Sequence, residues 1–193
     1  MIYYIPIIIL LNIMNTQKLL KLWTEDQGSS MKITLQDKIR KLMKYNNLQN
    51  IYRGVLLNVD IIKQKKDRIQ IKNNLQSWTK SIETAKNYSK KGGYQSRCYF
   101  GSKCSNLNLV RVILVSLDNS VSRVKSLDIE DVKGYSYYSD DREVILDRPV
   151  FKILFSKYKY DHTKGIYYIP VIFYKTSNVN KRTFIEKFVS PFI

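Results

Sequence analysis

The chain has 193 residues, 44% hydrophobic and 25% charged, which is the composition of a globular domain with one hydrophobic core. Neither a repeat nor a low-complexity block is present, so repeat and low-complexity architectures are excluded. Lysine and arginine number 33 against 16 aspartate and glutamate, and this net charge of +17 favours anionic partners: nucleotides, nucleic acid, acidic proteins or anionic membranes. A coding bias toward Lys, Asn, Ile and Tyr would produce the same excess, so charge alone assigns no function.

Residues 1–20 form an apolar N-terminal segment whose uncharged run is too short to span a bilayer, which takes about 20 residues. The length suits a signal peptide, but no Lys or Arg precedes the run and no small-residue cleavage site follows it. The segment is therefore a signal or targeting segment, an overextended start, or a first element packed on the core. Export or delivery is favoured over the cytoplasm, and no stable membrane span is expected. Residues 21–193 are predicted to form a single domain, expected to be a monomer.

Cysteine and histidine are scarce in this chain. Cys98 and Cys104 would close a hairpin as a disulfide in an exported protein, and would remain thiols in the cytosol. Two cysteines and one histidine are too few for an ordinary structural zinc site, so no metal is expected. His162 lies in a predicted turn, where a solvated loop position is expected.

The first half of the chain reads largely as helix. Residues 37–49 place Ile39, Leu42 and Met43 at helical spacing. A second helix is predicted from about Ser81, which would be its N-cap, with residues 82, 85 and 88 on one side. Residues 66–74 fit either a connecting strand or a loop.

From about residue 108 the hydrophobic period changes to that of strands. Three β-branched and aromatic runs follow, at residues 109–117, 143–158 and 165–175, with turn signals between them. Helices first and strands afterwards predict an α+β fold with a mainly antiparallel sheet.

Two segments in the first half carry candidate binding residues. Residues 51–57 read as a strand that presents Arg53, a fork of donors suited to phosphate, followed by Gly54, which lets a ligand approach the backbone. Residues 77–79 read as a strand that sends the hydroxyls of Ser77 and Thr79 to one face and the indole to the other. Each segment has an alternative interpretation. Arg53 would be an arginine at a solvent-exposed strand end, and Ser77 and Thr79 would cap the start of a helix.

A third segment concentrates acids in a basic chain. Asp141 and Glu143 are two residues apart, so in an extended chain they face the same way, just before an apolar strand. Two carboxylates so placed repel each other, and something cationic should offset them. A cationic transition state is one candidate, and the neighbouring Arg142 and Arg148 are the other.

Taken in order, the three segments resemble the mono-ADP-ribosyltransferase family of the arginine, serine and glutamate type. An aromatic-Arg-Gly strand is matched by residues 52–54, and a Ser-x-Ser/Thr strand leading into a helix by residues 77–88. An aromatic residue, Glu or Gln, and the catalytic Glu before an apolar strand are matched by residues 138–146, with Asp141 as the departure. The resemblance covers about residues 37–175. It implies N-terminal helices followed by a mainly antiparallel two-sheet core.

The resemblance also implies a function and roles. The enzyme would cleave the nicotinamide–ribose bond of NAD, its co-substrate, and transfer ADP-ribose to a macromolecule. Glu143 would stabilise the positive charge that develops on the ribose, and Ser77 would hold that carboxylate in place. Arg53 would pair with the NAD phosphates, Thr79 would support Ser77, and Tyr138 would meet the acceptor.

Asp141 is where the acceptor is expected to be chosen. Because a carboxylate binds a guanidinium, a protein arginine is favoured, and the basic surface leaves a nucleic-acid acceptor open. Two alternatives remain: an NAD glycohydrolase on the same fold, and a non-enzymatic basic module that binds nucleic acid or membrane through its charge.

Overall fold

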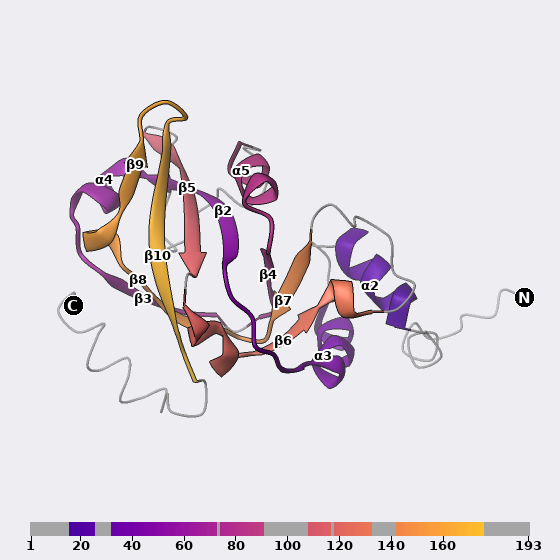
Figure 1. Cartoon of the computed structure of the whole chain (residues 1–193). Helices are drawn as coiled ribbons and strands as arrows, with labels where there is room; N and C mark the ends of the chain where they lie inside the picture. The colour runs from indigo at the N-terminus through magenta and orange to yellow at the C-terminus, as the bar shows by residue number, and fades with distance from the viewer. Residues whose placement is uncertain are drawn as a thin grey trace, which may run out of the picture.

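The computed structural model describes residues 16–25, 32–72, 74–90, 108–116, 118–132 and 142–175 (Figure 1). Most of the N-terminal apolar segment, Cys98, Cys104, and the loop residues Tyr138 and Asp141 lie outside the described residues. Within the described ranges, no helix is both long and apolar enough to cross a membrane.

Two helices open the described chain, α2 (Thr16–Glu25) and α3 (Lys32–Leu42), and they lie beside β6 and β7 (Figure 1). The predicted helical spacing is confirmed for Ile39 and Met43, which are buried, although Met43 follows the last residue of α3. Leu42 differs, because its side chain is 36% exposed. The helix therefore buries a narrower face than the sequence pattern indicated.

The described strands form one continuous ten-stranded sheet, in the order β1-β6-β7-β4-β2-β5-β10-β8-β3, with β9 paired to β10. Their bounds are β1 (Lys44–Tyr45), β2 (Ile51–Asn58), β3 (Arg68–Ile71), β4 (Gln76–Thr79), β5 (Leu109–Ser116), β6 (Lys125–Asp128), β7 (Glu143–Leu146), β8 (Val150–Ile153), β9 (Lys159–Asp161) and β10 (Ile166–Tyr174). The segment left open between strand and loop is thus partly a strand, β3. The prediction of a mainly antiparallel sheet is confirmed, and the β5–β10 pair is parallel.

The prediction of two sheets is corrected by the course of β10. Residues 166–170 of β10 pair with β5, whereas residues 171–174 pair with β8. A single strand of nine residues therefore belongs to both halves of a curled sheet. Sequence patterning could not show this, because a strand shared between two partners has the same hydrophobic period as a strand with one.

The sheet separates the described core into clusters on its two faces. The largest cluster includes Trp78, whose ring packs edge-on against Phe151 and Phe173 at centroid distances of 5.7 and 5.2 Å. A second cluster joins α2 and α3 to Ile145 of β7. Because side chains alternate along β4, Trp78 enters the first cluster and its neighbour Ser77 faces away from it. This confirms the predicted split between hydroxyl face and indole face.

Helix α5 (Ile82–Lys90) follows β4 directly and lies against β2. The predicted N-cap is confirmed, since Ser81 Oγ accepts from the backbone N–H of Thr84 at 3.2 Å. Arg111 of β5 donates to the carbonyl oxygen of Lys86 and to the hydroxyl of Ser89 in α5, each at 3.3 Å. Tyr88, expected on the packed side, is 42% exposed instead. Arg111 therefore ties the C-terminal half of α5 to the sheet.

The close contact of α5 with β2 depends on Gly54. A Cβ at this position would lie 1.9 Å from the carbonyl oxygen of Ala85 and 2.7 Å from the amide nitrogen of Ser89. Only a residue without a side chain lets the helix backbone approach the strand this closely. Ala85 is fully buried in the same contact.

Candidate active site

The candidate site is built where β4 and β7 run antiparallel. Thr79 is opposite Glu143 in the register and Ser77 is opposite Ile145, so Ser77 and Glu143 are diagonal neighbours on one face. Ser77 Oγ donates a short hydrogen bond to Glu143 Oε1 across 66 residues of sequence. Both residues are half-buried. The predicted hydroxyl and carboxylate are therefore brought together.

Arg53 reaches the same place from β2. Strands β2 and β4 pair only at Tyr52 and Thr79, so the two strands diverge toward Ser77. Arg53 crosses this divergence, and its Nη1 donates a short hydrogen bond to the carbonyl oxygen of Ser77. Side chains alternate along β2, so Arg53 leaves the strand on the same face as Ile51 and Val55, which belong to the largest cluster. The guanidinium thus braces the backbone of the residue whose hydroxyl holds Glu143.

Lys72 is a second cation at this place, and the sequence analysis did not select it. Burial and the positive charge of Arg53 lower the pKa of Lys72 from its usual 10.5 to about 8. Lys72 follows β3, and its backbone N–H donates to the carbonyl oxygen of Pro149 at 3.1 Å. The positive charges of Lys72 and Arg53 repel each other, and an anion bound between them would offset this repulsion. No sequence pattern predicts this pair, because Arg53 lies in β2 whereas Lys72 lies in the link after β3.

Trp23 also contacts the site, and it too was missed. Its indole Nε1 donates to Glu143 Oε1 at 3.1 Å, from a helix 120 residues away in sequence. The ring is only 6% exposed. The sequence offered one weak signal, since a tryptophan on the buried side of an amphipathic helix needs a partner for its N–H.

Two of the predicted binding residues have clear local partners. The Thr79 hydroxyl accepts from the backbone N–H of Ser81 at 2.9 Å, so it helps to start α5. The space beside Gly54 is filled by the backbone of α5, and helix packing accounts for this glycine without a ligand. A ligand beside Gly54 stays a prediction.

An ionic network lies at the start of β7, next to Glu143. Lys80 donates to Asp128 at 2.8 Å and, by a shorter bond, to Glu130, and Arg142 donates to Glu130 at 2.8 Å. The hydrogen bonds from Lys80 and Arg142 lower the pKa of Glu130. Arg142 itself has a left-handed backbone, with φ of 43°, and its carbonyl oxygen accepts from the N–H of Lys80 at 3.0 Å. The network fixes the backbone immediately before Glu143.

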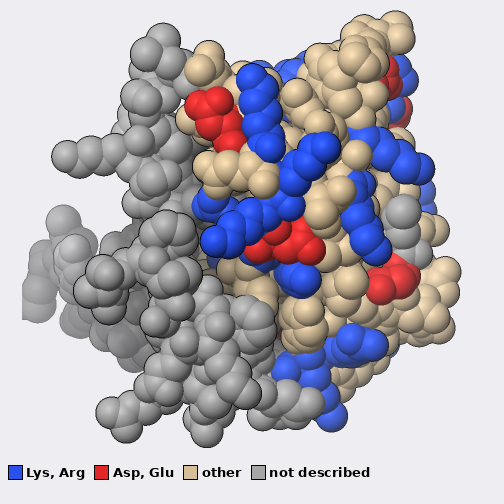
Figure 2. All heavy atoms as spheres, turned by 90° about the vertical axis from the view of Figure 1, so that its left-hand side faces the viewer, with Lys and Arg blue, Asp and Glu red and all other residues tan. Residues whose placement is uncertain are grey.

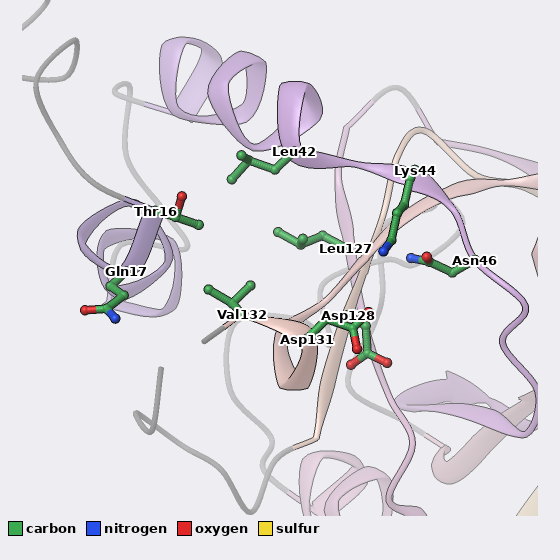
Figure 3. Close-up of a pocket in the computed structure, with 9 residues that line it drawn as sticks. All are labelled: Thr16, Gln17, Leu42, Lys44, Asn46, Leu127, Asp128, Asp131 and Val132. Carbon is green, nitrogen blue, oxygen red and sulfur yellow. The ribbon is translucent and has the colours of Figure 1, made fainter. Parts of the chain in front are cut away.

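A pocket of about 510 Å³ lies near this network, between α2, α3 and the region after β6 (Figure 3). None of the predicted site residues that the structure describes lines it. Its polar wall includes Asp128, the residue that also binds Lys80. The lining residues are Thr16, Gln17, Leu42, Lys44, Asn46, Leu127, Asp128, Asp131 and Val132. Among the described residues, no group of three or more His, Cys, Asp or Glu side chains could hold a metal ion.

No protein-family model matches the sequence, and no curated protein matches it. The structure does match solved structures of bacterial toxin ADP-ribosyltransferases over most of the chain. The Vis toxin of Vibrio splendidus is 18% identical with a TM-score of 0.42, and the match covers 68% of this chain and 51% of Vis. This chain thus spans about half the length of Vis.

Two further matches cover more of this chain. C3stau2 from S. aureus, solved with NAD, is 17% identical with a TM-score of 0.40, and 83% of this chain and 76% of that chain are covered. HopU1, an ADP-ribosyltransferase of Pseudomonas syringae pv. Tomato DC3000, is 13% identical with a TM-score of 0.41, and the shares are 85% and 61%. At such low identity these likenesses concern the fold alone.

Proposed function

We propose that the protein is an NAD-dependent mono-ADP-ribosyltransferase that transfers ADP-ribose to a macromolecule. The observation that carries the proposal is the placement of Ser77 Oγ on Glu143 Oε1, with Arg53 bonded to the backbone of Ser77. A carboxylate that a hydroxyl holds in place is the group that this reaction requires to stabilise positive charge on the ribose. Three residues from three segments of the sequence converge on it.

Glu143 is the residue that acts on the reacting sugar in this proposal. Breaking the nicotinamide–ribose bond of NAD develops positive charge on the ribose, and a fixed carboxylate stabilises that charge. Ser77 fixes the carboxylate, because its short hydrogen bond restricts the Glu143 side chain to one orientation. The charge is needed in the transition state rather than for binding NAD.

Arg53 and Lys72 are the residues that suit the phosphates. A dinucleotide carries two negative phosphates, and the mutual repulsion of these two half-buried cations is relieved when such anions bind. Burial is the larger cause of the lowered pKa of Lys72, and the charge of Arg53 lowers it further. No metal is required in this arrangement, since the cations are supplied by side chains.

The acceptor we propose is the arginine side chain of a protein, bound by Asp141. A carboxylate accepts two hydrogen bonds from a guanidinium, and Tyr138 offers a ring on which the guanidinium can stack. Neither residue is among those that the structure describes.

The domain of residues 21–193 is proposed to act as a single monomeric unit.

A nucleic-acid acceptor is the second candidate, and surface charge favours it. Figure 2 shows several Lys and Arg side chains on the face that carries α4 (Val59–Lys63), β3 and β9, with a smaller number of acidic side chains between them. Exposed lysines at positions 63, 65, 66, 157 and 159 belong to this part of the chain. Such a surface attracts phosphate backbones and steers their approach.

Substituting Asp141 by Asn separates transfer from hydrolysis. We expect Asp141→Asn to reduce transfer to a macromolecule far more than it reduces NAD hydrolysis, because water needs no guanidinium anchor. Incubation with labelled NAD and a lysate, followed by gel analysis of protein and nucleic acid, measures transfer, and nicotinamide release measures total turnover.

Each alternative has its own result in this experiment. Nicotinamide release matched by an equal amount of free ADP-ribose, with no labelled macromolecule, identifies a glycohydrolase. Salt-sensitive binding of DNA or RNA with no NAD consumption identifies a non-enzymatic basic module. Asp141→Glu should keep or raise transfer. If this variant loses transfer while NAD hydrolysis stays intact, arginine is excluded as the acceptor.

A further inference from the structure

We infer that Trp23 of α2 is a positioning residue for Glu143. The contact is the hydrogen bond from the indole Nε1 to Glu143 Oε1, 3.1 Å long and within the normal range for N–H···O. This inference rests on the proposed role of Glu143 as the carboxylate that acts on NAD. It assigns a task to a helix that none of the three sequence motifs includes.

The indole is held rigidly enough to direct a hydrogen bond. Trp23 is 6% exposed and belongs to the apolar cluster that joins α2, α3 and Ile145. Ile145 lies two residues after Glu143 on the same face of β7, so the cluster that holds the ring lies on the carboxylate's side of the strand. A buried ring has few rotamers left, and its N–H can therefore select one orientation of Glu143.

Ser77 and Trp23 act on the same oxygen from different elements. Ser77 Oγ of β4 and Trp23 Nε1 of α2 both donate to Glu143 Oε1. Hydrogen bonds to a carboxylate are about twice as strong as neutral ones, and two of them from separate elements fix both position and tilt. Docking of α2 is thereby coupled to the geometry of the carboxylate.

The chain supplies its own control for the indole N–H. Trp23 and Trp78 are its two tryptophans. The Nε1 of Trp78 is buried and has no hydrogen-bond partner among the described residues. Trp23→Phe and Trp78→Phe therefore make the same chemical change, but only Trp23→Phe removes a bond to Glu143.

The first test observes the bond itself and needs no enzymatic activity. In ¹⁵N-labelled protein, two indole N–H resonances are assigned from the two Trp→Phe variants. Glu143→Ala should move the Trp23 resonance upfield and speed its hydrogen exchange, whereas Glu130→Ala, which removes a nearby carboxylate bonded to Lys80 and Arg142, should not. A Trp23 resonance that Glu143→Ala leaves in place would overturn the inference, whatever the protein catalyses.

The second test measures the consequence for turnover. Trp23→Phe should lower kcat for nicotinamide release by roughly tenfold with KM for NAD nearly unchanged, the loss expected for one hydrogen bond to a charged group. Trp78→Phe should retain kcat. Equal kcat in wild type and Trp23→Phe would refute positioning even if the bond exists. A separate experiment tests the proposed function. If the Glu143→Gln variant still consumes NAD, the proposed role of Glu143 fails, whatever Trp23 does.

Discussion

At the scale of single residues, the candidate site depends on hydrogen bonds that hold side chains rather than on unusual side chains. Glu143 accepts from Ser77 and Trp23, and Arg53 donates to the backbone of Ser77. Each of these residues is half-buried or buried. In such surroundings a hydrogen bond is stronger than in water, so each partner restricts the carboxylate more than it would on a surface.

Arg53→Lys is predicted to weaken NAD binding by about tenfold. Lysine keeps the charge, but it lacks the planar fork that can brace the Ser77 carbonyl with one nitrogen while others face phosphate. Isothermal calorimetry with NAD measures the effect. Arg148→Lys is the matched control, because Arg148 is exposed and pairs with Asp147. Unchanged affinity in Arg53→Lys would show that the guanidinium does not contact NAD.

Lys72→Met is predicted to stabilise the folded protein at neutral pH. The folded state lowers the pKa of Lys72 from 10.5 to about 8, so charged Lys72 is less favourable in the folded than in the unfolded chain. Below pH 8 both states carry the charge and the wild type bears the full penalty, on the order of 1–3 kcal/mol. Methionine removes it.

The pH dependence of this effect has a definite sign. Between pH 8 and 10.5 the folded state loses its proton first, so wild-type stability rises with pH and its difference from Lys72→Met closes. Urea unfolding across that range measures the difference. Lys63→Met, at an exposed lysine, controls for the loss of one charge. A Lys72→Met variant less stable than wild type at pH 7 would contradict the burial argument.

At the scale of elements, the packing of α5 on β2 sets where β4 begins its pairing with β7. The helix follows β4 after Lys80 and Ser81, and its backbone lies against Gly54. Thr79 and Ser81 supply side-chain acceptors that start the helix. Any displacement of α5 is therefore transmitted to β4, which carries Ser77.

Gly54→Ala is predicted to destabilise the fold by about 3 kcal/mol or more, because the new Cβ would overlap backbone atoms of α5. Gly165→Ala is the control: its φ is +62°, but nothing lies within 4 Å, so only about 1 kcal/mol of backbone strain is expected. Thermal unfolding compares the two. A Gly54→Ala variant that stays stable and loses only NAD binding would instead support a ligand beside this glycine.

Element types were predictable wherever one period dominated. The strands that carry Arg53, Ser77 and Glu143, and the N-cap Ser81, follow from local pattern and capping chemistry. Exposure of Tyr88 and Leu42 was not predictable, since the width of a helix's buried face depends on what packs against it.

At the scale of the whole molecule, a single curled sheet brings the site residues together. β10 joins the two halves of the sheet, and a four-residue link from Ile71 to Gln76 connects β3 at one end of the path to β4 near its middle. Lys72, in that link, thereby comes near enough to Arg53 for the two charges to repel each other. The curl is visible in Figure 1 as the crossing directions of β10 and β3.

The parts of the site that sequence alone could not supply are those that depend on this curl. Motif spacing indicated Arg53, Ser77 and Glu143, because each sits at a recognisable strand. Trp23 and Lys72 lie outside every motif, and only long-range docking of α2 and of the β3–β4 link brings them in. Asp141 and Tyr138 stay predictions.

Nicotinamide release by Glu143→Gln shows whether the Glu143 carboxylate acts in the cleavage of NAD. The Gln carbonyl can still accept from Ser77 and Trp23, so circular dichroism and thermal unfolding should match wild type. We predict that turnover at saturating NAD falls by far more than about tenfold, or about 1.4 kcal/mol of transition-state stabilisation. A folded Glu143→Gln protein that loses less than tenfold would contradict the account.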